Sequence, residues 1–176
     1  MSFLNIVKND MLAAAYKVNS SENKIRFTTF VMLMLTPEFR LVLSYRIYSS
    51  VYRRGYIKLS MFLYLWAKKK YSSDIHPCCN IGVPIKLGHH MSIVIGPDVC
   101  IGNNVYIMNN VSIGNKTVGG ANRMPTIGND VIIGVGARLL GSIDIGNNAY
   151  IGANSGVICN VPQKQTWAGI PAKKIS

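Results

Sequence analysis

The chain has 176 residues and a formal net charge of +12; 49% of its residues are hydrophobic and 15% are charged. This composition excludes a disordered chain, because enough apolar surface is present to form a core, and the length indicates one domain or one domain with a helical annex. The four cysteines show no CxxC spacing, which favours reduced thiols over a disulfide framework or a zinc site.

The positive charge is concentrated in the first part of the chain. Residues 1–73 carry a net charge of +9, and residues 74–176 carry +3. No helix-turn-helix, RNP or zinc-finger pattern accompanies this excess, so we expect no nucleic-acid partner. An anionic lipid surface, an acidic acceptor or simple solubility accounts better for it.

Residues 1–73 are predicted to be helical. Pro37 opens an amphipathic segment that runs to Tyr48, and proline is favoured in the first turn of a helix. A second segment, about 56–70, ends in three lysines, which suit a helix C-terminus, and Gly55 separates the two segments.

The aromatic side chains of the second segment are flanked by lysines. This pattern indicates either packing on the rest of the protein or contact with a membrane surface. The longest clean apolar run, residues 30–35, is far too short to span a bilayer. We therefore expect a cytoplasmic protein, with peripheral contact at the inner face of the plasma membrane as an open alternative.

From residue 75 an aliphatic side chain returns every six positions. A period of six fits neither a helix nor a half-buried strand, and it predicts a parallel β-helix in which three hexads close one triangular coil. Glycine or an Asn-Asn pair is expected at the tight corners, where positive φ is needed. The returning residues are Ile75, Ile81, Leu87, Ile95, Ile101, Ile107, Ile113, Ile127, Ile133, Leu139, Ile145, Ile151 and Val157.

The repeat slips twice. Between Leu87 and Ile95 the spacing is eight residues, which predicts a bulge near Ser92 to Val94. The second slip inserts eight residues, 119–126, that are rich in turn formers and cannot continue a strand. Such insertions on repeat proteins tend to lie on the functional face, so we expect this segment to protrude as a loop.

The candidate chemistry is a carboxylate and an imidazole. Asp74 and His89 are fifteen residues apart, and a coil needs about eighteen, so we expect them on adjacent coils at about the 4.8 Å strand spacing. A carboxylate beside an imidazole fixes its tautomer and makes the other nitrogen a better base. His76 is expected to be structural because it precedes Pro77 in a corner, and His90 either lines the site or faces solvent.

Five short segments together resemble the serine O-acetyltransferase family of hexapeptide transferases, over about residues 35–175. This resemblance implies a left-handed parallel β-helix over residues 74–162, preceded by a helical region, 1–73, and followed by a tail on the CoA side, 163–176. It also implies a homotrimer with acetyl-CoA in the groove between neighbouring prisms. The segments are Asp74-Ile75-His76-Pro77, Leu87-Gly88-His89, Ile93-Val94-Ile95-Gly96, Asn122-Arg123-Met124-Pro125 and Ala168-Gly169-Ile170-Pro171-Ala172-Lys173.

The resemblance also implies roles for single residues. His89 corresponds to the general base and Asp74 to the carboxylate that orients it, for direct attack of an acceptor hydroxyl on the thioester, with no acyl-enzyme and no metal. Arg123 corresponds to a contact with the acceptor's carboxylate. The positions that correspond to cofactor contacts are Gly134, Val135 and Ala153 along the pantetheine arm and Lys173, with Lys174, at the CoA phosphates.

Departures from the family pattern lie in the acceptor site. Met124 stands where the family has histidine, and residues 22–36 offer no convincing counterpart of the family's acidic contact. We therefore expect the capsule, O-antigen and colanic-acid branch, with a saccharide hydroxyl as acceptor held near Arg123, Met124 and His90. Serine acetylation remains the main alternative, because Arg123 still permits it.

Two alternatives come from other classes. A metal-dependent carbonic anhydrase on the same prism needs three well-spaced imidazoles, whereas two of the three histidines here are adjacent. A purely structural β-helix leaves the Asp74/His89 pair unexplained.

Overall fold

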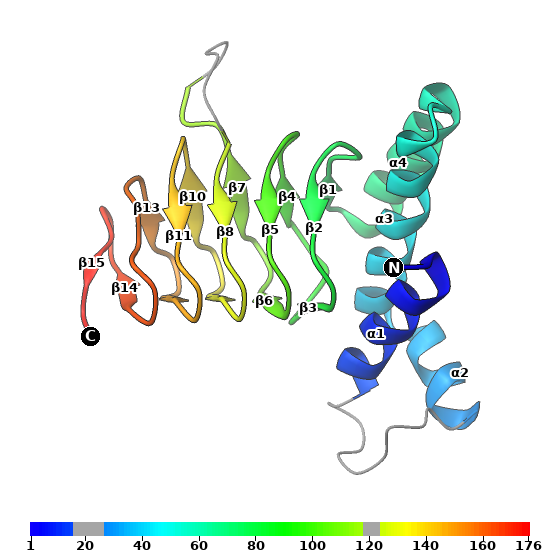
Figure 1. The fold of residues 1–176 in the computed structure, drawn as a ribbon, viewed down its shortest axis with the longest axis horizontal. Coiled ribbons are helices and arrows are strands. Elements are labelled where there is room, and N and C mark those ends of the chain that lie inside the picture. Colours follow the sequence, from blue (N-terminus) through cyan, green and yellow to red (C-terminus); the bar gives the residue numbers. More distant parts are fainter. Residues whose placement is uncertain (16–26, 118–123) are drawn as a thin grey trace.

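The structure is a computed structural model that describes residues 1–15, 27–117 and 124–176. It begins with four helices, which gather at one end of the molecule (Figure 1). Among the described residues, none of these helices is both long and apolar enough to cross a membrane. The helices are α1 (Phe3–Ala15), α2 (Phe27–Leu35), α3 (Pro37–Arg53) and α4 (Ile57–Tyr71).

The rest of the described chain is a triangular prism with three sheets. Except for the last two strands, successive strands enter different sheets, and strands of successive coils pair in parallel, so the chain winds as a β-helix. The predicted fold class is confirmed. One sheet contains β1 (Asp74–Ile75), β4 (Val94–Ile95), β7 (Ser112–Gly114), β10 (Arg138–Leu140) and β13 (Gly156–Val157), and the second contains β2 (Asn80–Ile81), β5 (Cys100–Ile101), β8 (Thr126–Ile127) and β11 (Asp144–Ile145). The third contains β3 (Ile85–Leu87), β6 (Val105–Ile107), β9 (Ile132–Ile133), β12 (Tyr150–Ile151), β14 (Thr166–Ala168) and the antiparallel β15 (Lys173–Lys174).

The returning aliphatic residues form columns inside the prism. Strand register places Ile107 beside Ile133, and Ile133 beside Ile151, on consecutive coils of the third sheet. All three side chains are fully buried. Burial of each such side chain contributes about 1.5–3 kcal/mol, so the hexad pattern supplies the prism with most of its stabilising contacts.

The corners of the prism use glycine and asparagine for different purposes. Asn104 and Asn148 have positive φ, 54° and 58°, as expected of the Asn-Asn pairs. The glycines after the aliphatic residues do not, so the expectation that they supply positive φ is wrong. Instead, a Cβ on Gly102 would lie 2.7 Å from the carbonyl carbon of Gly128 on the next coil. Glycine is required there because two backbones approach each other closely.

The first coil has an edge that no earlier coil covers. Along the strands, N–H groups of one coil donate to carbonyls of the following coil, as Asp74 N does to Ile93 O at 2.7 Å, so the first-coil carbonyls that face the annex have no earlier coil to supply a donor. Helix α3 supplies donors from its side chains: the Tyr48 hydroxyl donates to Ile75 O at 2.7 Å and the Tyr45 hydroxyl to Cys79 O at 2.8 Å. The annex therefore caps the open edge of the prism.

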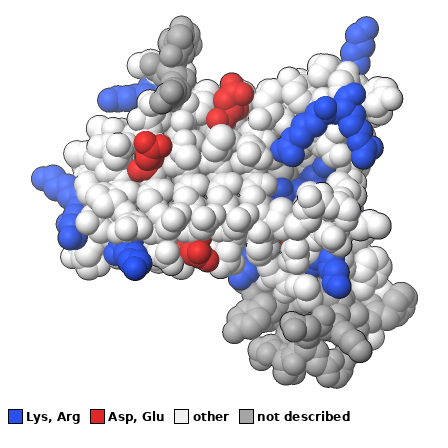
Figure 2. All heavy atoms as spheres, in the orientation of Figure 1, with Lys and Arg blue, Asp and Glu red and all other residues white. Residues whose placement is uncertain are grey.

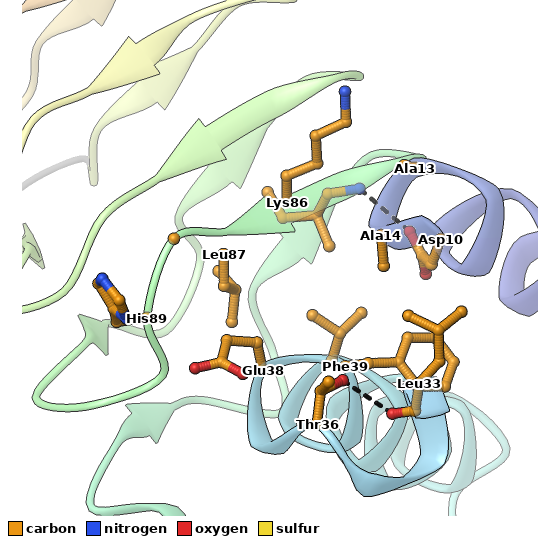
Figure 3. Close-up of a pocket in the computed structure, with 13 residues that line it drawn as sticks. Asp10, Ala13, Ala14, Leu33, Thr36, Glu38, Phe39, Lys86, Leu87 and His89 are labelled. Carbon is orange, nitrogen blue, oxygen red and sulfur yellow. Dashed lines mark hydrogen bonds between the residues drawn. The ribbon is translucent and has the colours of Figure 1, made fainter. Parts of the chain in front are cut away.

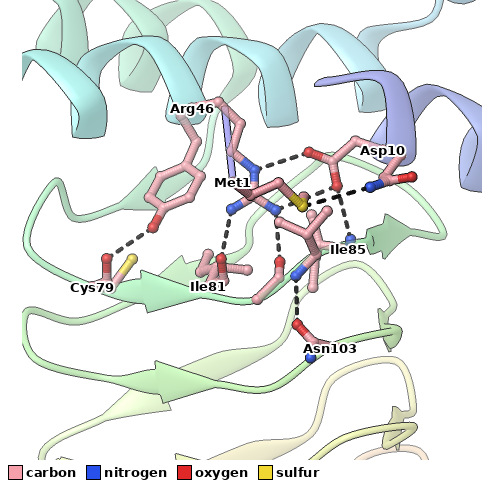
Figure 4. Close-up of polar contacts among 11 residues, drawn as sticks. Met1, Asp10, Arg46, Cys79, Ile81, Ile85 and Asn103 are labelled. Atoms are coloured by element: carbon pink, nitrogen blue, oxygen red, sulfur yellow. Dashed lines mark hydrogen bonds and ion pairs between the residues drawn. The ribbon is translucent and has the colours of Figure 1, made fainter. Parts of the chain in front are cut away.

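A buried ion pair is also part of this cap (Figure 4). Arg46 Nε donates to Asp10 of α1 at 2.9 Å, while its two terminal nitrogens donate to Ile81 O at 2.6 Å and Gly82 O at 2.7 Å. Asp10 also accepts the backbone N–H of Ile85 at 3.0 Å. The Arg46 and Asp10 side chains are 7% and 2% exposed. One guanidinium thus joins α1, α3 and the first coil.

Helix α4 has one packed face and one exposed face. Tyr64, Ala67 and Tyr71 are buried, whereas Phe62 and Trp66 are exposed. On the face shown in Figure 2, basic side chains lie mainly toward the two ends of the molecule and acidic ones on the prism between them. Membrane contact by α4 stays a prediction.

Candidate active site

His89 lies where the prism meets the annex. It follows β3, in the lengthened turn that leads to the second coil, and its side chain is exposed. Within the described residues it has no hydrogen bond or ion pair. The imidazole borders a cavity of about 310 Å³ between β3 and helices α1 and α3 (Figure 3). The phase slip after Leu87 thus interrupts the regular prism with a longer turn, and this turn places a histidine at the edge of a cavity.

Asp74 does not occupy the place that its spacing predicts. It opens β1, in the same coil that His89 follows, and its neighbour on the adjacent coil is Val94. The prediction that Asp74 and His89 lie on adjacent coils is therefore wrong, because the next coil reaches the position of Asp74 only at Val94, and His89 comes five residues before it. No hydrogen bond joins the two side chains in the described structure.

The carboxylate of Asp74 is instead held by α4. The Tyr64 hydroxyl donates to one oxygen, and Lys68 Nζ lies 2.5 Å from the other. Burial and the bond to Asp74 raise the pKa of Tyr64, and the hydrogen bond to Asp74 raises the pKa of Lys68. Both donors therefore keep their protons at neutral pH. An orienting role for Asp74 toward His89 stays a prediction.

The other two histidines turn toward neighbouring elements. His76 Nδ1 accepts the N–H of Cys78 at 3.1 Å, and its ring packs edge-on against Tyr64, which is what a structural corner residue does. His90 Nδ1 lies 3.3 Å from Glu38 Oε1 of α3, and its ring meets Tyr71 edge-on. His90 is partly buried and faces the annex, so neither of the two expected placements describes it fully.

The predicted cofactor residues lie at one corner of the later coils. Gly134 N donates to Ile151 O at 2.8 Å, and a Cβ on Gly134 would lie 2.7 Å from the nitrogen of Ala153, so these two positions are stacked. Val135 is part of the same turn and Ala153 is exposed. Lys173 is exposed on β15 and pairs with Ala168. Their contact with CoA stays a prediction.

The insertion predicted to form a loop, residues 119–126, is described only from Met124 onward. Arg123 lies outside the described residues, so its predicted contact with an acceptor carboxylate is not placed. Met124 is half-buried and packs on the prism core, with its Cε 3.7 Å from the position of a Cβ on Gly96. Its part in acceptor binding stays a prediction.

Sequence reasoning missed three residues of this region. Glu38 borders the cavity, and Tyr64 and Lys68 bind Asp74. All three residues belong to helices. The spacing of residues along the sequence does not indicate where a helix packs on the prism. The one signal in the sequence was Pro37, which places Glu38 in the first turn of a helix.

Known proteins share this sequence pattern and fold. Residues 124–159 match the family described as bacterial transferase hexapeptide (six repeats). The serine acetyltransferase of Buchnera aphidicola subsp. Acyrthosiphon pisum (strain APS) is 37% identical over 176 residues, which cover 99% of this chain and 62% of that protein. The serine acetyltransferase of Escherichia coli (strain K12) is 38% identical over 80% of this chain and 52% of its own length. The chain thus spans about half to two thirds of these relatives.

Two solved structures extend the comparison. A Neisseria gonorrhoeae serine acetyltransferase in complex with serine superposes with a TM-score of 0.86 and 31% identity, over 99% of this chain and 69% of that one. A Brucella abortus serine acetyltransferase in complex with coenzyme A gives a TM-score of 0.87 at 27% identity, over 99% and 68%. The relatives matched at 35–38% identity are serine acetyltransferases, so the expected capsule, O-antigen or colanic-acid branch with a saccharide acceptor is wrong. The chain belongs to the hexapeptide-repeat acetyltransferase family.

Proposed function

We propose that this protein transfers the acetyl group of acetyl-CoA to the hydroxyl of L-serine. The observation that carries the proposal is the match over 99% of the chain to a serine acetyltransferase, together with the shared fold of one that binds serine. The similarity includes the prism and also the annex, so both walls of the cavity have counterparts in the relatives.

His89 is the group in the cavity that suits a general base. Its imidazole takes the proton of the serine hydroxyl while that oxygen attacks the thioester carbonyl of acetyl-CoA. The tetrahedral intermediate then breaks its C–S bond, and the thiolate of CoA receives the proton from His89. The products are O-acetylserine and CoA, and His89 returns to its neutral form.

The acetyl-CoA is held by the later coils in this proposal. Gly134, Val135 and Ala153 present backbone and small side chains at one corner, and Lys173 adds a cation near the end of the prism. A single prism provides only one wall of a groove there. We therefore propose a homotrimer, whose neighbouring prism supplies the other wall.

The assay follows thiol release from acetyl-CoA with L-serine as the acceptor and identifies O-acetylserine by mass spectrometry. A kcat/KM for serine of about 10⁴ M⁻¹s⁻¹ or more, typical of a natural substrate, supports the proposal. A value far below that, with faster transfer to another hydroxyl compound, contradicts it. Sedimentation at assay concentration tests the trimer, and a fully active monomer would exclude it.

A further inference from the structure

The cavity beside His89 contains a carboxylate to which the proposed mechanism gives no task. Its walls are largely apolar, formed by side chains such as Leu33, Phe39 and Leu87, and His89 stands at one end (Figure 3). Glu38, in the first turn of α3, extends its carboxylate toward the end where His89 lies. A charged group among apolar walls loses hydration free energy unless another group binds it. The partner of the Glu38 carboxylate therefore has to be identified.

The other charged groups of the cavity are already engaged or point elsewhere. Asp10 is 2% exposed, and its carboxylate binds Arg46 and the backbone N–H of Ile85. Lys86 extends away from Glu38 in Figure 3. Glu38 is 29% exposed, so of the two acids that line the cavity it is the one whose carboxylate a ligand can reach.

Glu38 is also held in place. His90 Nδ1 lies 3.3 Å from Glu38 Oε1, and the His90 ring is fixed edge-on against Tyr71. The His90 backbone carbonyl accepts the Ser73 hydroxyl, which ties the same turn to the start of the prism. The contact with His90 uses one oxygen of Glu38, and the other oxygen has no partner among the described residues.

We propose that Glu38 binds the ammonium group of the acceptor and that His90 is a positioning residue that holds Glu38 for this task. The inference rests on serine as the acceptor. In serine the hydroxyl and the ammonium group sit on neighbouring carbons, so an acceptor whose hydroxyl reaches His89 presents its ammonium group within the same small cavity. The apolar walls reduce screening by water and strengthen a carboxylate–ammonium pair.

Glu38 thereby determines which hydroxyl compounds are acetylated. A site with a buried or half-buried acid discriminates against acceptors that lack a cation, because the acid then loses its water without gaining a partner. The predicted preference is for a β-hydroxy amine with a carboxylate over 3-hydroxypropanoate, which differs from serine only in lacking the amino group.

The test compares Glu38→Gln with the wild type, using L-serine and 3-hydroxypropanoate. Glutamine keeps the shape and the contact with His90 but loses the charge. We expect KM for serine to rise roughly 10- to 100-fold, the loss typical of a hydrogen bond to a charged group, with a smaller change in kcat and none in KM for acetyl-CoA. For 3-hydroxypropanoate, kcat/KM should stay the same or rise.

Three controls separate binding from folding. Glu38→Asp keeps the charge and should restore part of the serine affinity. Asp144→Asn removes one exposed carboxylate from β11 and should leave both KM values unchanged. His90→Ala should raise KM for serine less than Glu38→Gln does, and the double variant should be no worse than Glu38→Gln alone, because both changes act through one carboxylate.

The outcomes distinguish this inference from the proposed function. If the wild type acetylates serine and Glu38→Gln leaves KM for serine unchanged, or lowers kcat/KM equally for both acceptors, the role of Glu38 is excluded and serine acetylation stands. If the wild type does not acetylate serine, the proposed function and the role of Glu38 are both contradicted.

Discussion

The prism and the helical annex are stabilised in different ways, and the candidate site lies where they meet. Inside the prism, identical hexads stack aliphatic side chains in columns, such as Ile107, Ile133 and Ile151, and each coil pairs its backbone with the next. The annex attaches through polar side chains instead. Arg46, Tyr45 and Tyr48 donate to carbonyls that the first coil leaves without a ladder partner.

This difference shows how a repeat fold acquires a specific site. Regular coils offer the same surface on every turn, so a repeat alone does not single out one histidine. In the described part of the chain the annex packs against β1 and β3 of the first coil, and it forms one side of the cavity beside His89. In our proposals the prism supplies the general base, His89, and the annex supplies the carboxylate that binds the acceptor, Glu38.

The largest effect should come from removing the prism's contribution to the chemistry. We expect His89→Ala to lower kcat by roughly 10² to 10⁴, the usual span for a general base, with little change in affinity for CoA. Steady-state kinetics and CoA titration measure the two quantities. His76→Ala is the control, because His76 binds the Cys78 N–H in a corner. Equal losses in the two variants would contradict the assignment.

The next largest effect is expected on protein stability, from a substitution at the contact between the prism and the annex. Arg46→Met removes one partner of a buried ion pair and leaves Asp10 without its cation, so we expect a loss of about 3–5 kcal/mol in the free energy of unfolding. Urea unfolding monitored by circular dichroism measures it. Arg53→Met, at an exposed arginine of the same helix, should change stability by less than about 0.5 kcal/mol. Similar losses at both positions would show that the ion pair is not the main attachment.

Within the prism, two glycines should respond differently to the same substitution. Gly102→Ala places a Cβ 2.7 Å from the carbonyl carbon of Gly128, and we expect a loss of about 1–3 kcal/mol from the resulting overpacking. Gly114→Ala meets nothing within 4 Å and should be neutral, or stabilising by up to about 1 kcal/mol. Thermal unfolding of both variants tests this. A larger loss at Gly114 would refute the close-approach explanation.

The smallest effect is expected at the exposed pair of α4 and β1. Lys68 and Asp74 are 46% and 30% exposed, so Lys68→Met should cost no more than about 1 kcal/mol. Because the bond to Asp74 raises the pKa of Lys68 above 10.5, its contribution is fully present below pH 10.5 and is lost only as the pH rises further. The stability difference between the two proteins should therefore be constant from pH 7 to 9. A difference that changes within that range would contradict the assignment.

The sequence predicted the prism because its fold depends on local, periodic contacts. The column of Ile107, Ile133 and Ile151 follows directly from the period of six. The exposure of His89 could also be anticipated, since the slip after Leu87 interrupts the prism at that point. The predicted pairing of Asp74 with His89 on adjacent coils was wrong, because the neighbour of Asp74 on the next coil is Val94 and His89 still belongs to the first coil.

The acceptor was wrongly predicted for a related reason. The interpretation depended on acidic residues near positions 22–36 and on Met124, and it found no partner for an ammonium group. In the structure Glu38 reaches the cavity because α3 lies across the first coil, 51 residues before His89 in the sequence. Such a contact depends on tertiary packing, which a single sequence does not report.

The most direct test of the central claim is a crystal structure of the protein with CoA and L-serine bound. We predict the serine hydroxyl within hydrogen-bonding distance of a His89 ring nitrogen and the serine ammonium group against the Glu38 carboxylate, in the cavity between β3 and the annex. Serine bound away from His89, or a saccharide bound there in preference to serine, would contradict the account.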